Sequence, residues 1–217
     1  TIMEEGTEFI QRLNDKDAKF PMFTSCSPGW VRYIEMYQQE YIPNLSSAKS
    51  PHQMMGAVMK HHYAKKLNVD PKNMIVVSIM PCIAKKFESK RPEMESEGLR
   101  DVDLVITTRE LARFIKKKKI DFKELEELKV HSEFAQFTGA GVIFGATGGV
   151  MEAALRTAYE LVTGREVPFK NLNIEPVRGM EGIREATIKI ENPVKEWAFL
   201  DGVELKCAVA HGLINAK

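Results

Sequence analysis

Residues 73–80, NMIVVSIM, are an almost unbroken apolar run that is bounded by prolines. A strand covered on both faces has this pattern, so we expect a central strand of a parallel sheet here. Residues 103–107, DLVIT, form a second apolar run, and Thr107 with Glu110 makes the capping box of a following helix. Strands that alternate with helices predict an α/β fold with a mostly parallel, doubly wound sheet flanked by helices.

Further elements are expected on both sides of these two runs. They are a helix over 2–14, a short buried strand over 21–26, a helix from Pro28 to about Gln39 with Ser27 as its N-cap, a helix that follows Ser50, a helix over 150–163, and strands over 172–179, 183–190 and 204–210. In the helix after Ser50, the residues Met55, Val58, Met59 and His62 lie on one face. We expect two lobes, a first α/β lobe over 1–150 and an incomplete second lobe over 151–217.

The composition is that of an ordinary soluble globular protein. The 31 basic and 30 acidic residues leave a formal charge of +1, so no overall field favours nucleic acid. No apolar stretch approaches the roughly 20 residues of a membrane span, and we expect no charged-then-apolar leader ahead of the fold. Three cysteines do not make a disulfide framework, and they favour metal or redox chemistry in a reducing compartment. We therefore expect a cytoplasmic protein with no nucleic-acid or membrane partner.

Two cysteine-bearing turns follow predicted strands. Residues 24–30, TSCSPGW, contain Cys26, and residues 80–88, MPCIAKKFE, contain Cys82. Open α/β folds gather reactive groups at the ends of their strands, and Cys thiolates hold iron–sulfur clusters. On chemistry alone, two thiols are weak evidence for a cluster, and burial in the core is the competing interpretation. Cys207 lies in an alternating strand, which favours a buried packing role for it.

A glycine-rich turn, TGAGVIFGATGG at residues 138–149, leads into the helix over 150–163. Such a turn can cradle phosphate, but it has neither the dinucleotide spacing nor the ending of a P-loop. Close backbone packing beside another ligand is the favoured interpretation. A flavodoxin-like cofactor-binding module is suggested only by the sheet and this turn.

Six blocks of the sequence resemble the catalytic domain of the iron-only (FeFe) hydrogenases. They are EEGTEF (4–9), TSCSPGW (24–30), LSSAKSP (45–51), MPCIAKKFE (80–88), RDVDLVITTREL (100–111) and GAGVIFGATGGVMEAALR (139–156). The resemblance implies two α/β lobes around an iron–sulfur H-cluster, in which a four-iron cubane (4Fe-4S) is joined to a two-iron subsite. It also implies reversible reduction of protons to dihydrogen, with electrons from a ferredoxin-like carrier or from iron–sulfur domains or subunits.

The resemblance assigns residues to the cluster. Ser27 stands where the family has a cubane-ligating cysteine, and Cys82 matches a second cubane ligand. Lys85 matches the lysine that donates a hydrogen bond to an iron-bound cyanide, a suitable use of a compact ammonium. The other cofactor-binding residues are Met80 and Pro81, and His52, which stands where a Gln is common near a diatomic ligand.

The resemblance also implies a proton relay. Cys26 matches the thiol that passes protons to the two-iron subsite, and Glu5, Glu8, Arg12 and Ser46 match the path from the surface to that thiol. Glu5 and Glu8 are three residues apart and share a helical face. The alternative is that both are ordinary surface carboxylates.

Two departures from the family pattern bear on activity. A serine hydroxyl is a poor ligand for cluster iron, which weakens the site at Ser27. The third signature segment, with two further cysteines, is absent from these 217 residues. We therefore expect a fragment or apo-form of a hydrogenase catalytic subunit that is inactive alone, in which the cluster can be absent and a second chain can carry the missing motif. The alternative is a non-catalytic, hydrogenase-like protein of iron–sulfur assembly or sensing.

Overall fold

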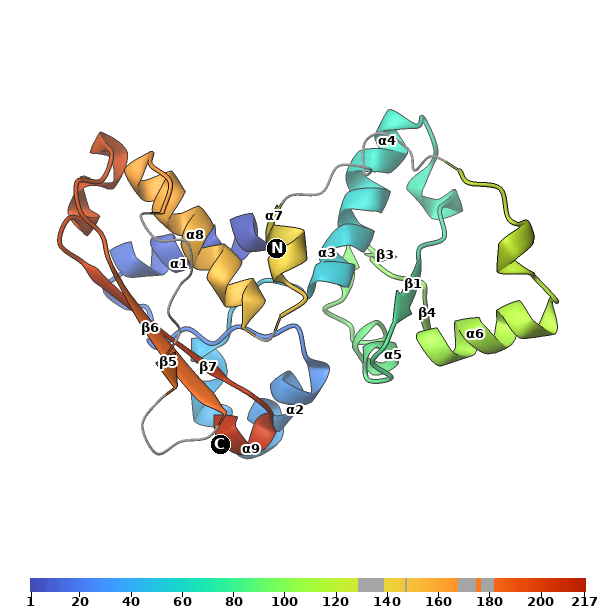
Figure 1. Ribbon diagram of the computed structural model, residues 1–217, viewed down its shortest axis with the longest axis horizontal. Coiled ribbons are helices and arrows are strands. Elements are labelled where there is room, and N and C mark those ends of the chain that lie inside the picture. Colours follow the sequence, from blue (N-terminus) through green and yellow to red (C-terminus); the bar gives the residue numbers. More distant parts are fainter. Residues whose placement is uncertain (129–138, 147, 168–174, 177–181) are drawn as a thin grey trace. The chain divides into compact units, whose positions relative to one another are not determined.

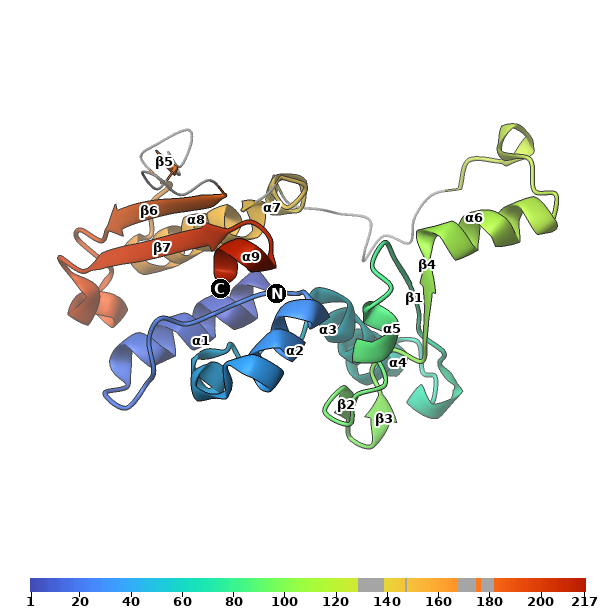
Figure 2. The ribbon, with the colours of Figure 1, turned by 90° about the horizontal axis from the view of Figure 1, so that it is seen from below.

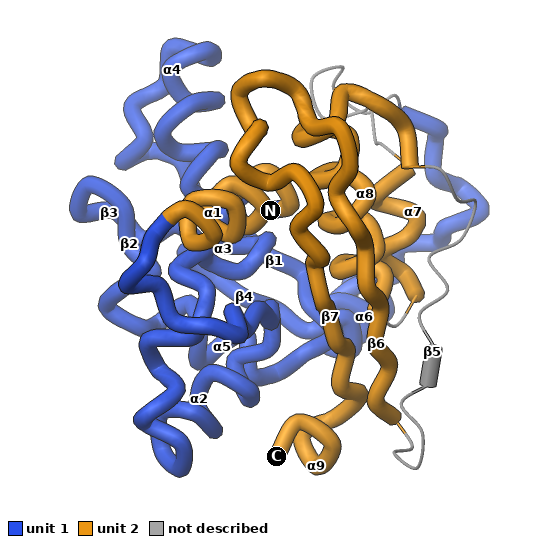
Figure 3. Tube along the Cα trace, turned by 90° about the vertical axis from the view of Figure 1, so that its left-hand side faces the viewer, with its two compact units in different colours: residues 1, 15–128 blue, residues 2–14, 129–217 orange. Residues whose placement is uncertain are grey.

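The computed structural model describes residues 1–128, 139–146, 148–167, 175–176 and 182–217. The chain forms two compact units, which Figure 3 shows in different colours. Unit 1 comprises Thr1 and residues 15–128, and unit 2 comprises residues 2–14 and 129–217. The boundaries of these units differ from those of the expected lobes over 1–150 and 151–217. The division into those lobes stays a prediction.

Unit 1 contains short helices and two small sheets (Figure 1). Its elements are α2 (Pro28–Tyr37), η1 (Gln39–Asn44), α3 (Pro51–Val58), the π-helical turn η2 (Met59–Tyr63), α4 (Ala64–Lys66), η3 (Pro71–Asn73), β1 (Val77–Met80), α5 (Lys85–Glu88), β2 (Glu95–Ser96), β3 (Leu99–Arg100), β4 (Leu104–Thr107), α6 (Thr108–Lys117) and η4 (Phe122–Glu124).

The two apolar runs form the expected parallel pair. Strand β1 pairs with β4 in parallel, in a register that runs from Val77 opposite Leu104 to Met80 opposite Thr107. The expectation of a central strand covered on both faces is wrong, because only the last four residues of the run 73–80 are strand and Ile79 is 46% exposed. Sheets within the described residues have two, two and three strands, and the β1–β4 pair is the parallel part of the expected mostly parallel, doubly wound sheet among them.

The predicted helix starts are confirmed in unit 1. Ser27 and Ser50 are the N-caps of α2 and α3, and a proline follows each of them. Helix α6 begins with the predicted capping box, in which the Glu110 amide donates to Thr107 Oγ1 at 3.1 Å and the Thr107 amide donates to Glu110 Oε2 at 2.8 Å. These signals lie within four residues of one another, so the local sequence is sufficient to set them.

The predicted buried strand over 21–26 is wrong. Phe23 makes an isolated parallel bridge to Leu45, with its amide 2.8 Å from the Asn44 carbonyl oxygen and its carbonyl oxygen 2.7 Å from the Ser46 amide. Beyond this bridge the segment lies exposed through Cys26. A single bridge leaves the rest of the segment without the ladder that a strand needs.

The helix after Ser50 is present, but it buries a polar face. Met55 and Val58 are 49% and 44% exposed. The residues buried on α3 and the following turn are His52, Gln53, Gly56 and Lys60. The apolar face predicted from Met55, Val58, Met59 and His62 is therefore not the buried one.

Unit 2 packs two helices against an antiparallel sheet (Figure 2). Its elements are α1 (Ile2–Asn14), α7 (Gly139–Ile143), α8 (Gly149–Thr163), β5 (Glu175–Pro176), β6 (Ile183–Lys189), η5 (Lys195–Leu200), β7 (Glu204–Ala210) and α9 (Leu213–Ala216). The core joins Ile10 of α1 and Leu155 of α8 to Ile188 of β6 and Leu205 of β7. The strands predicted over 183–190 and 204–210 are present as β6 and β7, which pair in an antiparallel register from Ile183 opposite Ala210 to Lys189 opposite Glu204.

Parts of two sequence predictions in unit 2 lie outside the described residues. They concern the strand over 172–179, of which Glu175–Pro176 is described, and the glycine-rich turn, of which residues 138 and 147 are not described. The helix predicted over 150–163 is present as α8. Across the described parts of both units, no helix has the length and apolar character to cross a bilayer.

Candidate functional site

The two cysteine-bearing turns meet at Lys85. Cys26 and Cys82 are both exposed, whereas the Lys85 side chain is buried. Lys85 Nζ donates a hydrogen bond to the Cys26 carbonyl oxygen, and the Lys85 amide donates to the Cys82 carbonyl oxygen at 3.3 Å. The sequence motifs at 24–30 and 80–88 are therefore neighbours within unit 1.

A buried carboxylate, Glu88, holds the other side of the Lys85 ammonium. Lys85 Nζ lies 3.1 Å from Glu88 Oε1 and 3.0 Å from Glu88 Oε2. Ser50 Oγ donates to Glu88 Oε2 at 2.9 Å, and His52 Nε2 is hydrogen-bonded to the same oxygen. His52 Nδ1 in turn lies 3.0 Å from Ser78 Oγ. We call these five residues, Ser50, His52, Ser78, Lys85 and Glu88, the Glu88 cluster; all five are buried.

The Glu88 cluster keeps its carboxylate ionised. Burial by itself raises the pKa of Glu88, but the hydrogen bonds from His52, Lys85 and Ser50 and the charge of Lys85 outweigh it, so the pKa lies below its ordinary value. An ionised carboxylate accepts hydrogen bonds and donates none. His52 Nε2 therefore carries the proton of the bond to Glu88.

The remaining cluster-binding predictions lie next to these turns. Met80 ends β1, is partly buried and is followed by the exposed Pro81 and Cys82. Ser27 begins α2 as its N-cap residue, but its hydroxyl makes no capping hydrogen bond. The Ser27 amide donates to Ser25 Oγ at 3.1 Å. These positions agree with a shared site, while their roles toward a cluster stay predictions.

The predicted relay residues are distributed over both units. Ser46 lies in unit 1, where its amide donates to the Phe23 carbonyl oxygen at 2.7 Å, three residues before Cys26. Glu5, Glu8 and Arg12 lie on α1 in unit 2, and Arg12 forms an ion pair with Glu8 at 2.7 Å. Glu5 and Glu8 are both partly buried rather than fully exposed. The relay as a continuous path stays a prediction.

Three members of the Glu88 cluster, Ser50, Ser78 and Glu88, were not among the predicted site residues. Ser78 interrupts the apolar run 73–80, and a polar residue inside a buried strand needs a partner. Glu88 lies three residues after Lys85, so the two side chains face each other across one helical turn. Both signals are visible in the sequence.

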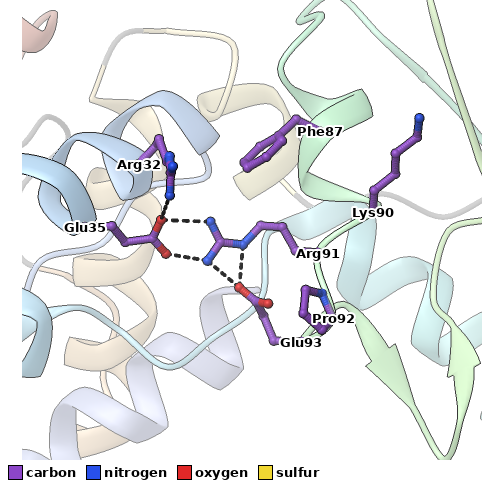
Figure 4. A pocket seen from close by; sticks show the side chains of 7 residues that line it. All are labelled: Arg32, Glu35, Phe87, Lys90, Arg91, Pro92 and Glu93. Carbon is purple, nitrogen blue, oxygen red and sulfur yellow. Dashed lines mark hydrogen bonds and ion pairs between the residues drawn. The ribbon is translucent and has the colours of Figure 1, made fainter.

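A separate pocket of about 390 Å³ lies between α2 and the segment that follows α5 (Figure 4). In this pocket the Arg91 guanidinium forms ion pairs with both Glu35 and Glu93 (Figure 4). The hydrogen bond from Arg91 holds the pKa of Glu35 below its ordinary value. None of the predicted site residues lines this pocket, in which Arg32 and Arg91 both pair with Glu35 and Arg91 also pairs with Glu93.

The cysteines of this chain can supply some, but not all, of the thiolates that an iron–sulfur site needs. In the portion of the chain that the structure describes, no three His, Cys, Asp or Glu residues are grouped to hold a metal ion. Cys207 packs against the core of unit 2, as predicted, and burial raises the pKa of its thiol to about 11. Cys26 and Cys82 are the exposed thiols, and beside them the Lys85 ammonium suits an anionic ligand.

The whole chain, residues 1–217, matches the family model described as "Iron only hydrogenase large subunit, C-terminal domain". The chain belongs to the iron-only hydrogenase family. This hydrogenase chain is 49% identical to Iron hydrogenase 1 of Clostridium pasteurianum over 218 residues, which cover 100% of the chain and 38% of that relative. It is also 34% identical to the cytosolic Fe-S cluster assembly factor narfl of Xenopus tropicalis, over 82% of the chain and 40% of that relative.

The fold of the hydrogenase chain is that of a solved family member. It matches an apo FeFe-hydrogenase HydA1 variant from Chlamydomonas reinhardtii with a TM-score of 0.82 and 42% identity, over 99% of the chain and 59% of that structure. The chain spans less than half the length of the two curated relatives. The predicted family and its mixed α/β catalytic-domain fold are therefore confirmed.

Proposed function

We propose that this chain forms the part of an H-cluster catalytic domain that carries the Cys26 and Cys82 turns. The protein that contains it would reduce protons to dihydrogen reversibly. The observation that carries the proposal is the position of Lys85, a buried ammonium hydrogen-bonded to the Cys26 turn and following directly on the Cys82 turn. When bound, the H-cluster supplies the redox chemistry at iron.

Each residue of the site then has a task that its chemistry suits. Cys82 would hold cubane iron through its thiolate, Met80 would pack against the two-iron subsite, and Pro81 would lie beside the bound cofactor. Lys85 donates a hydrogen bond to an anionic ligand, in an orientation that Glu88 maintains. The Cys26 thiol passes protons, which arrive through the relay residues Glu5, Glu8, Arg12 and Ser46.

The 217-residue chain alone is proposed to evolve no dihydrogen. It has three cysteines, and the thiol of Cys207 is packed against the core of unit 2. A cubane held by four thiolates needs more than Cys26 and Cys82 can supply. The active assembly would therefore include further thiolates, from a complementing chain or segment, and a ferredoxin-like electron donor. A cytoplasmic location remains part of the proposal.

One specific observation favours a second function. Ser27 replaces a cluster ligand of the family by a poor iron ligand, and an assembly factor is among the relatives of the chain. A non-catalytic role in iron–sulfur assembly or sensing would tolerate the loss. The hydrogenase proposal is preferred because the identity is higher, 49% against 34%.

Anaerobic reconstitution tests the proposal. The chain is supplied with iron, sulfide and the hydrogenase maturation proteins, and bound iron, the paramagnetic-resonance spectrum and dihydrogen evolution from reduced viologen are measured. We expect labile iron and no dihydrogen from the chain alone. Dihydrogen evolution by the unsupplemented chain would refute the proposed inactivity, and a stable cluster that is handed to an apo-ferredoxin would favour the assembly function.

A further inference from the structure

The Glu88 cluster connects a histidine to the lysine of the proposed site. His52 is 7% exposed, and Lys85 and Glu88 are 6% exposed, so solvent screens their charges little. Glu88 Oε2 accepts from three donors that come from two segments of the chain. These donors are Ser50 Oγ before α3, His52 Nε2 on α3 and Lys85 Nζ on α5. A carboxylate held from two helices fixes the position of an ammonium that is bound to it.

The hydrogen bonds of His52 are compatible with two protonation states. Nε2 donates to the ionised Glu88 in both states. Nδ1 faces Ser78 Oγ at 3.0 Å, and a hydroxyl can donate to a neutral Nδ1 or accept from a protonated one. His52 can therefore gain a proton without losing a partner, which a glutamine at this position cannot do.

Few charged groups face the His52 ring among the described residues. Helix α5 contributes Glu88, in direct contact, and Lys85 through Glu88. Strand β1 contributes the uncharged Ser78, and the next residue of α3, Gln53, lies with Nε2 3.5 Å from His52 Nε2. A charge on a protonated His52 ring thus acts mainly on the Glu88 carboxylate and, through it, on the Lys85 ammonium.

We propose that His52 is a positioning residue for Lys85 and acts through Glu88. It holds the carboxylate from the α3 side, so that the ammonium points toward the Cys26 turn. A proton on His52 adds a second cation that competes with Lys85 for one carboxylate oxygen, and the ammonium is then held less firmly. The consequence for an anionic cluster ligand rests on the proposed function, whereas the positioning of Lys85 does not.

Lysine-detected NMR on the iron-free, full 217-residue chain tests this inference. Hydrogen exchange of the Lys85 ammonium is compared in the original chain, His52→Phe and His52→Gln. We expect about tenfold faster exchange in His52→Phe, because one charged hydrogen bond to Glu88 is lost. His52→Gln restores slow exchange, because its amide can donate to the same oxygen. His62→Phe, an exposed neighbour on η2, is the matched control and leaves the exchange rate unchanged.

A pH titration separates positioning from mere packing. In the original chain, the Lys85 ¹⁵N shift changes with the same midpoint as the His52 ring signals, and in His52→Gln this inflection is lost. Unchanged exchange in a folded His52→Phe overturns the inference, and so does an identical Lys85 titration in the original chain and His52→Gln. If His52→Phe does not fold, the comparison with His52→Gln decides alone. No iron is present, so a negative result leaves the proposed hydrogenase function standing.

Discussion

Glu88 is the residue on which the buried site of unit 1 depends most, because Ser50, His52 and Lys85 all donate to its carboxylate. Glu88→Gln keeps the shape of the side chain but leaves the Lys85 ammonium without its counter-charge. Removing one partner of a buried ion pair costs roughly 3 kcal/mol. We therefore expect Glu88→Gln to lower the free energy of unfolding by about that amount near neutral pH, as measured by urea denaturation.

The effect of Glu88→Gln has a definite pH dependence. The pKa of Glu88 is lower in the folded chain than its ordinary value of 4.5, so ionisation stabilises the folded state. This contribution is complete above the ordinary value and is lost as the pH falls through the lowered one. The stability difference between the two proteins should therefore shrink in acid. Glu40→Gln, at an exposed carboxylate, is the control, and a difference that is constant down to about pH 3 would contradict the assignment.

Cys207 should be the least reactive of the three thiols. Burial raises the pKa of its thiol to about 11, whereas Cys26 and Cys82 are exposed. The thiolate is the species that reacts with iodoacetamide, so we expect Cys207 to be labelled more than about tenfold more slowly near pH 8. Mass spectrometry of the labelled native chain measures the three rates. In urea the rates should converge, and equal labelling of Cys207 in the native chain would refute its burial.

At the residue scale, the resemblance grouped the residues of the candidate site but did not predict the hydrogen bonds among them. It brought Lys85 together with the Cys26 and Cys82 turns, and the structure places them side by side. It gave no role to Glu88, although a buried lysine requires a counter-charge and Glu88 is the acidic residue one helical turn away. Which side chains satisfy a buried charge depends on segments far apart in sequence, such as those that contain Ser50 and Ser78.

At the scale of elements, the helix starts and four strands follow the sequence predictions, whereas the strand predicted over 21–26 does not form. The N-caps Ser27 and Ser50 and the capping box of Thr107 are local signals, and all are confirmed. The strand over 21–26 fails because strand formation needs a partner elsewhere in the chain, and Leu45 offers a single bridge. The buried face of α3 is polar for the same non-local reason, since His52 faces Glu88 and Ser78.

Close packing of α3 gives a prediction at this scale. A Cβ added to Gly56 would collide with the backbone of Asp101, with the Asp101 carbonyl carbon only 2.6 Å away. We expect Gly56→Ala to destabilise the chain by about 2 kcal/mol or more, because backbone must move to relieve the collision. Gly6→Ala is the matched control on α1, where a Cβ meets nothing within 4 Å. It should stabilise the chain by about 0.5 kcal/mol through helix propensity. Thermal unfolding distinguishes the two signs, and an equal effect of both substitutions would contradict the packing argument.

At the scale of the whole molecule, two lobes over 1–150 and 151–217 stay a prediction, while tertiary packing divides the described chain into two compact units. Helix α1 belongs to unit 2, because Ile10 packs with Leu155 and Ile188 in its core. Residues so far apart in sequence are joined by tertiary packing alone, and neither composition nor periodicity reports such a contact. The residues of the predicted proton relay are divided between the units as well, with Glu8 in unit 2 and Ser46 in unit 1.

The number of available thiolates decides the activity of the whole molecule. Ser27→Cys adds one thiol to those of Cys26 and Cys82. If Cys26 is kept for proton transfer, the remaining thiols are still too few to hold a cubane through four thiolates. We expect reconstituted Ser27→Cys to retain more iron and sulfide than the original chain and to evolve no dihydrogen from reduced viologen. Activity should require a further segment or a second polypeptide that supplies the missing thiolates. Ser25→Cys, at an exposed serine outside the ligand position, is the control and should retain no additional iron. Dihydrogen from Ser27→Cys alone would show that fewer protein thiolates suffice than the proposed site requires.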